Sequence, residues 1–200
     1  MKIIVAVTAA SGAIYARLLL ERLLRSEEVR EIALIFSRQA EEVARYEGVR
    51  FPEDGRILRY DRDDMFAPPA SGSADYDAMA VIPCSAGTLG RIAAGTSQSL
   101  IERAADVMLK ERRRLVLVLR ETPLSLLHLR NMTVLTEAGA VILPAAPAFY
   151  ARPATIEELC GSVVERTTAL LGLRLPGYRW TGDDGQHPAE APVPESAAGK

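Results

Sequence analysis

Hydroxyl-bearing and charged side chains recur directly after short apolar runs in this 200-residue chain. Ser11, Ser37 and Ser85 each come soon after such a run, and Arg120 with Glu121 follows another. A hydroxyl beside a helix N-terminus can bind a phosphate, a guanidinium binds an anion, and a carboxylate can transfer a proton. These residue types predict a phosphate-bearing ligand with sugar alcohols, and a proton-transfer step next to it.

The same residues also have purely structural interpretations. Ser11 stands where a helix N-cap is expected in a tight strand–helix turn, and Ser37 is explained by itself as an N-cap. Arg120 and Glu121 could form an ordinary ion pair at the edge of a sheet. A charged pair directly after the apolar residues 115–119 nevertheless favours a functional role, because neither side chain belongs unpaired in a core.

Two aromatic residues and an arginine near the C-terminal end leave the same choice open. Tyr150 could offer a hydroxyl to an anion and Phe149 could wall an apolar pocket, although spacing alone favours both as core residues. Arg166 lies inside the last expected helix, where a solvated surface arginine is the plain interpretation. Cys84 is expected to be a small buried thiol rather than a nucleophile.

Apolar runs and helical periodicity alternate along the chain. They predict one α/β domain with a three-layer, doubly wound, mostly parallel sheet of Rossmann-like type, whose ligand lies beyond the carboxyl ends of the strands. Residues 1–180 form this domain, and residues 181–200 are expected to be disordered because they have little to bury. The expected strands are 3–8, 31–37, 57–60, 78–83, 115–119 and 140–143, and the expected helices are 13–24, 38–47, 88–94, 99–111, 123–137 and 156–171.

Composition excludes several classes of function. With 48% hydrophobic and 25% charged residues and a formal net charge of −2, the chain has no basic field for nucleic acid or an acidic membrane. No apolar run reaches the roughly 20 residues that span a bilayer. Only two cysteines are present, which indicates a reducing compartment and hence the cytoplasm.

Metal and hydrolase sites are not expected either. Two histidines cannot build a His-rich metal site, and the acidic residues 61–64 lack the rest of a calcium-loop pattern. No G-x-S-x-G elbow supports a Ser-His-Asp triad.

Several segments in order resemble one family, the UbiX-type flavin prenyltransferases. Each segment alone is modest, but the ordered set spans residues 1 to about 175. The segments are Ala9-Ala10-Ser11-Gly12-Ala13-Ile14-Tyr15, Ala67-Pro68-Pro69-Ala70-Ser71-Gly72-Ser73, Pro83-Cys84-Ser85 with Gly87-Thr88-Leu89, Glu102-Arg103-Ala104-Ala105-Asp106-Val107, Leu109-Lys110-Glu111-Arg112-Arg113, Arg120-Glu121-Thr122-Pro123, Gly139-Ala140-Val141-Ile142-Leu143-Pro144 and Phe149-Tyr150.

The resemblance implies a flavodoxin-like, FMN-binding domain that assembles as a homododecamer with active sites between subunits. It implies a metal-independent transferase that joins the dimethylallyl group of dimethylallyl phosphate to N5 and C6 of reduced FMN. The prenylated FMN would serve a partner UbiD-type decarboxylase, as in ubiquinone biosynthesis.

The resemblance also implies roles for single residues. The cofactor-binding residues would be Ala9, Ala10, Ser11, Ser37, Ser85, Ala86, Gly87, Thr88 and Arg120; the prenyl phosphate would be held by Lys110, Arg120, Tyr150 and Arg166; the catalytic residues would be Ser11, Glu47, Lys110 and Glu121. Glu121 would take the proton from C6, with Ser11 near N5.

Three positions depart from the family pattern. Ala9 stands where the family has Gly, Met65 and Phe66 replace a Trp, and Ala151 follows the tyrosine where a polar residue is common. Two other functions remain open: a flavin-dependent decarboxylase of cysteine-derived substrates with a similar fold, and a non-catalytic FMN carrier. The decarboxylases use an early histidine, and none precedes residue 128 here.

Overall fold

The computed structural model describes residues 1–176, so the expected tail at 181–200 lies outside the described residues. Six strands form one sheet in the order β3-β2-β1-β4-β5-β6, and every neighbouring pair is parallel. The sheet is therefore parallel throughout, which agrees with the expectation of a mostly parallel sheet. The strands are β1 (Lys2–Val7), β2 (Glu31–Phe36), β3 (Ile57–Tyr60), β4 (Ala78–Cys84), β5 (Arg114–Leu119) and β6 (Val141–Pro144).

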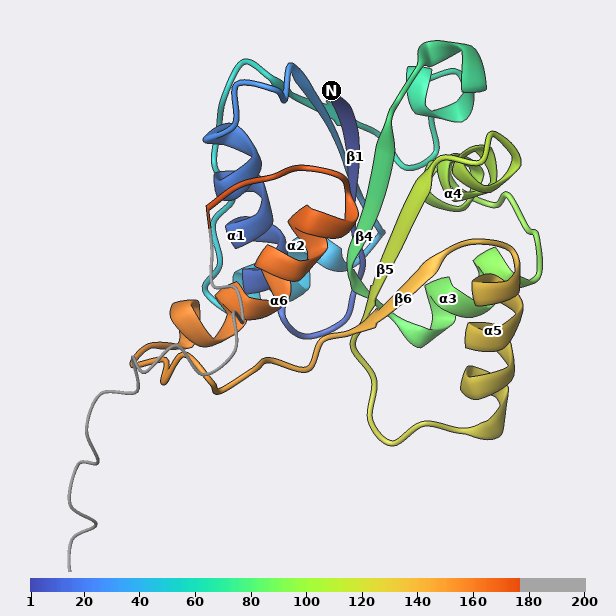
Figure 1. Ribbon diagram of the computed structural model, residues 1–200. Helices are drawn as coiled ribbons and strands as arrows, with labels where there is room; N and C mark the ends of the chain where they lie inside the picture. Colours follow the sequence, from blue (N-terminus) through green and yellow to red (C-terminus); the bar gives the residue numbers. More distant parts are fainter. Residues whose placement is uncertain (177–200) are drawn as a thin grey trace, which may run out of the picture.

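Helices cover both faces of the sheet, as Figure 1 shows. One face carries α1, α2 and α6, and the other carries α3, α4 and α5. Their bounds are α1 (Ala13–Leu24), α2 (Ala40–Tyr46), α3 (Ala86–Ala93), α4 (Leu100–Lys110), α5 (Leu126–Glu137) and α6 (Ile156–Leu170). Two short 3₁₀ helices, η1 (Pro68–Ala70) and η2 (Gly72–Ala74), interrupt the long connection after β3.

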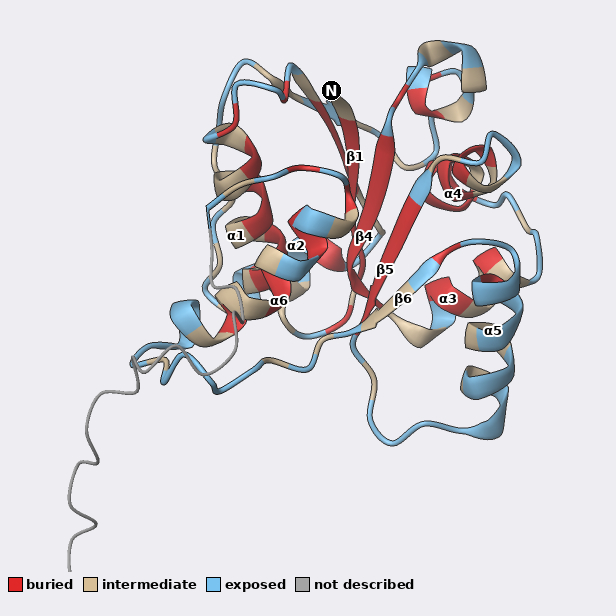
Figure 2. Ribbon diagram, viewed as in Figure 1, coloured by how far each residue is buried: buried red, intermediate tan, exposed pale blue. Residues whose placement is uncertain are grey.

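The central strands owe their place to their composition. β4 is buried along its whole length, and β1 is buried after its first residue. Such continuous apolar runs belong in strands that are covered on both faces. The result is two apolar layers, one under α1 and α6 and one under α3 and α4 (Figure 2).

The start of α5 corrects the expectation of a helix from Pro123. The helix begins at Leu126, after the N-cap Ser125, whose hydroxyl accepts a hydrogen bond from the His128 N–H. The imidazole of His128 in turn accepts from the Ser125 N–H, which completes a reciprocal capping box. This box sets the boundary three residues later than the proline does.

The outer surface of α5 is unusual for a helix on a parallel sheet. Leu135 is its only buried residue. Large apolar side chains face outward instead, at Leu126, Leu127, Leu129 and Val134. Figure 2 shows this helix mostly in the exposed class.

Strand order reverses between β1 and β4, since β1 leads to β2 and β3 on one side while β4 leads to β5 and β6 on the other. At such a switch point the loops beyond the two carboxyl ends diverge and leave room for a ligand. These connections are residues 8–12 after β1 and the single residue Ser85 after β4.

Candidate active site

The loops after β1 and β4 are tied together by the hydroxyl of Thr8. Its Oγ1 donates to the Pro83 carbonyl oxygen at 2.7 Å and accepts from the Ser85 N–H at 2.8 Å. Thr8 is buried. This double contact fixes the Ser85 loop against the start of the loop that carries Ser11.

Backbone hydrogen bonds also connect this edge to the ends of the flanking strands β2 and β5. The Ser37 N–H donates to the Val7 carbonyl at 2.9 Å, and the Arg120 N–H donates to the Cys84 carbonyl at 3.0 Å. The parallel ladder thus continues one residue beyond the strands. Ser37, the Ser11 loop, Ser85 and Arg120 therefore follow one another along the carboxyl edge, as the sequence predicted for strand ends.

The first turn of α3 offers unpaired donors at the middle of this edge. Ser85 is the N-cap, and its hydroxyl oxygen accepts from the Thr88 N–H at 3.3 Å. Within residues 1–176, the N–H groups of Ala86 and Gly87 have no hydrogen-bond acceptor. Open N–H groups at the positive end of a helix suit the oxygens of a phosphate or a flavin. With the nearby hydroxyls and the exposed Arg120, this donor set fits FMN.

The start of α1 is filled by a carboxylate of the protein itself. The Glu47 side chain accepts from the Gly12 N–H at 2.8 Å and from the Ala13 N–H at 2.8 Å. The N-cap is Gly12, with φ of 102°, and no side chain caps the helix at that residue. Ser11 is consequently not the N-cap of α1, and it is exposed. Likewise, Gln39 and not Ser37 is the N-cap of α2.

Gly12 also lies directly over an aromatic ring. A Cβ at this position would come within 2.9 Å of the Tyr15 ring, in a backbone conformation that favours glycine. Burial, and next the neighbouring Cys160, raise the pKa of Tyr15 to about 12, while the charge of Arg120 acts in the opposite direction. The phenol therefore stays neutral beneath the site.

Glu121 lies one residue beyond Arg120 on the same loop. It is half-buried, and its carboxylate accepts from the Thr122 N–H at 3.0 Å. No ion pair links Arg120 to Glu121 among the residues that the structure describes. The simple interpretation of the two as an ion pair is therefore wrong: Arg120 is exposed, Glu121 is half-buried, and neither charge is paired with the other.

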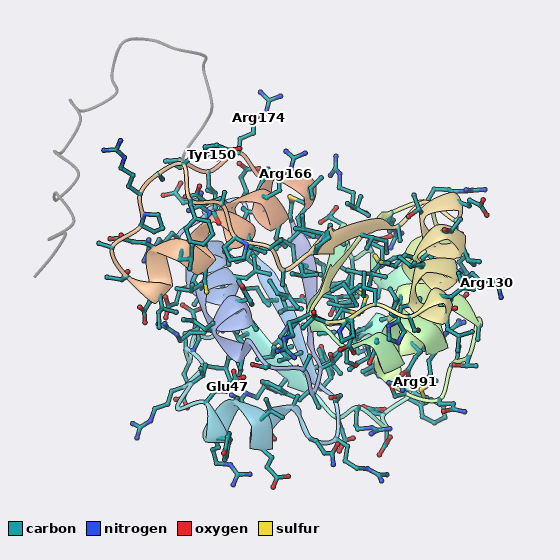
Figure 3. All side chains as sticks on the ribbon, turned by 90° about the horizontal axis from the view of Figure 1, so that it is seen from below. Glu47, Arg91, Arg130, Tyr150, Arg166 and Arg174 are labelled. Carbon is teal, nitrogen blue, oxygen red and sulfur yellow. The ribbon has the colours of Figure 1, made fainter. Side chains whose placement is uncertain are left out.

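Tyr150 and Arg166 line a second space, which runs along α6 and includes Arg114 at the amino end of β5. A cavity of about 1050 Å³ on α6 and the loop after β6 includes both residues, together with Glu158, Ser162 and Arg174. Figure 3, which views the molecule from below, has Tyr150 and Arg166 together on the α6 side and Glu47 across the edge beside α2. Phe149 and Tyr150 are 70% and 78% exposed, so the interpretation of both as core residues is wrong.

Lys110 is not brought to this group within one chain. It ends α4 and precedes β5, whereas Arg120 follows the carboxyl end of β5. The six-residue strand between them separates the two by roughly 20 Å. Lys110 pairs there with its neighbour Glu111 at 2.5 Å.

Two other sequence features have clear structural outcomes. Ala9 does not have a positive φ, so an alanine is accommodated without strain where the family has glycine. Cys84 is fully buried, as expected, and burial raises the pKa of its thiol to about 12. Such a thiol is not a nucleophile at neutral pH.

Two contributors at this edge, Thr8 and Arg91, are not among the residues predicted from the sequence. Arg91 donates to the Thr88 hydroxyl oxygen at 2.9 Å. Its position three residues after Thr88 on a helix was the available signal, because such residues are neighbours on a helix surface. Thr8 gave a weaker signal, as a polar residue that ends a buried apolar run.

Within the described part of the chain, no group of three or more His, Cys, Asp or Glu residues could hold a metal ion. Over the same residues, no helix is long and apolar enough to cross a membrane.

Comparison with known proteins gives one consistent family. Residues 1–169 match the family model called Flavoprotein. The chain is 43% identical to the flavin prenyltransferase UbiX of Methanocaldococcus jannaschii, over 86% of this chain and 94% of that protein. It is 45% identical to the flavin prenyltransferase UbiX of Pseudomonas aeruginosa, over 86% and 90% of the two chains.

Solved structures agree with the fold. AnUbiX (PadA1), in complex with FMN and dimethylallyl pyrophosphate, superposes with a TM-score of 0.80 at 44% identity, over 89% of this chain and 98% of that one. A dodecameric FMN-dependent UbiX-like decarboxylase from Escherichia coli O157:H7 gives 0.82 at 40% identity, over 90% and 99%. A PPC decarboxylase mutant at 17% identity shares the fold alone, with a TM-score of 0.60. With its hydroxyl-lined carboxyl edge and these relatives, the chain belongs to the flavoprotein family and, within it, to the UbiX flavin prenyltransferases.

Proposed function

We propose that this protein transfers the dimethylallyl group of dimethylallyl phosphate to N5 and C6 of reduced FMN. The observation that carries the proposal is the continuous carboxyl edge. There, hydroxyls, open N–H groups and Arg120 are held together by the hydrogen bonds of Thr8 and by backbone hydrogen bonds between neighbouring strand ends. FMN would bind Ala9, Ala10, Ser11, Ser37, Ser85, Ala86, Gly87, Thr88 and Arg120. When bound, the reduced flavin supplies the nucleophilic atoms that accept the prenyl group.

The role of the protein's side chains would be to stabilise the departing phosphate. As the bond to phosphate breaks, the prenyl carbon develops cationic character and the leaving group gains negative charge. Arg120, Tyr150 and Arg166 can stabilise that charge with fixed positive charge and hydrogen-bond donors, together with Lys110. The cationic carbon also requires a pocket that excludes water. The exposed aromatic ring of Phe149 would wall it, with Phe66 as a second candidate.

Carboxylates and a hydroxyl complete the proposed chemistry. Glu121, with no cationic side chain paired to it in the described chain, would accept the proton from flavin C6. Ser11 would lie near N5. Glu47 was expected among the catalytic residues, and its contacts with Gly12 and Ala13 support a role in holding the Ser11 loop in position.

Assembly is the second part of the proposal. A single chain keeps Lys110 at the opposite end of β5 and leaves the leucines of α5 uncovered. A homododecamer, as in the dodecameric relative, would cover α5 and bring Lys110 of one copy to the site of another. The active site would then lie between subunits.

The cellular setting follows from the product. Prenylated FMN would be consumed by a partner UbiD-type decarboxylase, in a pathway such as ubiquinone biosynthesis. The two cysteines are free and buried, which supports a reducing, cytoplasmic compartment.

Anaerobic incubation of the protein with reduced FMN and dimethylallyl phosphate tests the proposal, with the flavin analysed by mass spectrometry. We expect FMN with one added C₅H₈ unit. Unmodified flavin from a protein that binds it would instead identify an FMN carrier. Decarboxylation of a cysteine-derived peptide, with no prenylated flavin, would identify the related decarboxylase activity. Dimethylallyl pyrophosphate, run in parallel, establishes which leaving group is accepted.

A further inference from the structure

A chain of polar side chains runs from the cofactor edge into the protein interior. Arg91 donates from Nη2 to the Thr88 hydroxyl oxygen at 2.9 Å and from Nε to Glu102 Oε1 at 2.7 Å. The other Glu102 oxygen accepts from the Ser99 hydroxyl. One guanidinium therefore links a residue of the first turn of α3 to a carboxylate on α4.

The inner end of this chain is a buried charge. The side chain of Glu102 is 3% exposed, whereas that of Arg91 is 41% exposed. Burial by itself would raise the pKa of Glu102, but the hydrogen bonds from Ser99 and Arg91 and the charge of Arg91 outweigh it, so the pKa lies below its ordinary value. The carboxylate is ionised at neutral pH, and a buried ion of this kind holds its partner in one position.

The other end is the hydroxyl of Thr88, a residue only 2% exposed, and this hydroxyl has only its proton left to donate. Thr88 Oγ1 accepts from Arg91 and also from the Ser85 hydroxyl at 3.1 Å. A threonine oxygen has two lone pairs, so both are filled and the hydroxyl hydrogen must donate elsewhere. Within residues 1–176 it has no hydrogen-bond acceptor.

The position of the guanidinium connects this hydroxyl to the cofactor edge. A Cβ at Gly87 would lie 3.4 Å from Arg91 Nη1, so Arg91 packs against the turn whose Ala86 and Gly87 N–H groups are open. Figure 3 labels Arg91 beside α3.

We propose that Arg91 and Glu102 are positioning residues for FMN, which fix the Thr88 hydroxyl as a hydrogen-bond donor to an oxygen of the ribityl phosphate chain. The inference rests on the proposed function, because it takes FMN as the ligand. Without Arg91, the Thr88 hydroxyl can turn its proton toward Ser85 and no longer favours an acceptor on the ligand.

The dissociation constant of oxidised FMN, measured by quenching of flavin fluorescence with the apoprotein, tests this role. The variant Arg91→Met/Glu102→Gln removes both charges together, so no buried carboxylate is left unpaired. We expect about tenfold weaker binding, the effect of one hydrogen bond to a charged group. Thr88→Val should weaken binding to a similar extent, and Thr88→Ser, which restores a hydroxyl, should bind FMN more tightly than Thr88→Val does.

A double-mutant cycle separates positioning from a general structural effect. In the Thr88→Val background, the Arg91→Met/Glu102→Gln change should leave the FMN dissociation constant unaltered. The matched control is Arg59→Met/Glu41→Gln, which removes an exposed ion pair of 3.2 Å between β3 and α2 and should bind FMN normally. Thermal unfolding of each apoprotein verifies that the variants are folded.

The outcomes are distinct. If the Arg91→Met/Glu102→Gln change weakens FMN binding equally with and without Thr88, or not at all, the positioning role is overturned. The proposed prenyl transfer is not affected by that result. A non-additive cycle in a protein that does not prenylate FMN would support the positioning role and reject the proposed function. Failure of the wild type to bind FMN would overturn both. If the double variant is unstable, Arg91→Lys serves instead, because one ammonium cannot donate to both Glu102 and Thr88 in the same geometry.

Discussion

The carboxylate of Glu47 accepts hydrogen bonds from the Gly12 N–H through both of its oxygens, at 2.8 and 3.1 Å. Glu47 is the C-cap of α2, and Gly12 precedes α1, so two successive crossovers of the sheet are joined at the cofactor edge. The negative charge lies at the positive end of α1, where a phosphate would otherwise be stabilised. This arrangement directs an incoming anion to the open start of α3 instead.

Glu47→Ala should lower the free energy of unfolding by about 1–2 kcal/mol, comparable to the loss of a helix N-cap. Glu47→Gln should lose less, since one oxygen still accepts from the backbone. Urea unfolding at fixed protein concentration measures both variants. Glu53→Ala, an exposed loop substitution, is the control. Wild-type stability in Glu47→Ala would show that these contacts do not hold α1.

Glu121→Gln should bind FMN as the wild type does but form the final product about 10²–10⁴-fold more slowly, because the amide cannot accept the proton from C6. Single-turnover kinetics with mass analysis of the flavin measures the change. Glu137→Gln, exposed at the end of α5, is the matched control. Full activity of Glu121→Gln would remove the residue from proton transfer.

Lys110→Met and Arg120→Met should each be inactive alone, yet regain activity when co-assembled. If the two residues of one site come from different copies, random mixing at equal amounts leaves about a quarter of the sites with both side chains intact. Prenyl transfer by co-expressed variants measures this fraction. Because β5 separates the two residues in one chain, we expect recovery. A mixture that stays inactive would mean that each site draws both from the same chain.

Leu127→Lys should weaken assembly, because Leu127 is 69% exposed on the outer surface of α5 and would be buried against another copy. Analytical ultracentrifugation measures the oligomeric state. Glu27→Lys introduces the same charged side chain on a remote exposed turn and should assemble normally. An unchanged oligomer in Leu127→Lys would place the subunit interface elsewhere.

Tyr15 should make stability depend on alkaline pH. Its pKa is about 12 in the folded protein and 10.0 ordinarily, so the unfolded chain loses the phenolic proton first. The contribution of Tyr15 is complete below pH 10 and is lost as the pH rises toward 12. The difference in unfolding free energy between wild type and Tyr15→Phe, measured across this range, should change in that direction. A constant difference would mean that the phenol is not buried.

Much of the fold was predictable because local patterns and burial agree. The leucines of residues 13–24 gave the bounds of α1, and the short strand at 57–60 was also predicted to the residue. The start of α5 was not, since Pro123 signals a helix start while the mutual hydrogen bonds of Ser125 and His128 determine it. Such a cap depends on side-chain geometry that a pattern of residue types does not contain.

The residues of the site also fall into two groups: those that a sequence pattern predicts and those whose contacts depend on packing. Ser11, Ser37, Ser85 and Arg120 could be placed together because the ends of parallel strands share one edge. The pairing of Arg91 with Glu102 could not, because the two lie eleven residues apart on different helices and their contact depends on how α3 packs against α4. The location of Lys110 relative to Arg120 also could not be predicted, because it depends on how α4 and β5 follow one another in the folded chain.

The placement of Lys110 at the far end of β5 has a consequence for how the protein behaves when it is scarce. A lone subunit would retain the flavin-recognising edge but lack the ammonium that draws off the leaving group. Newly synthesised or strongly diluted molecules would thus bind flavin without prenylating it. Turnover would begin only once subunits have met, and would rise more steeply than in proportion to their abundance.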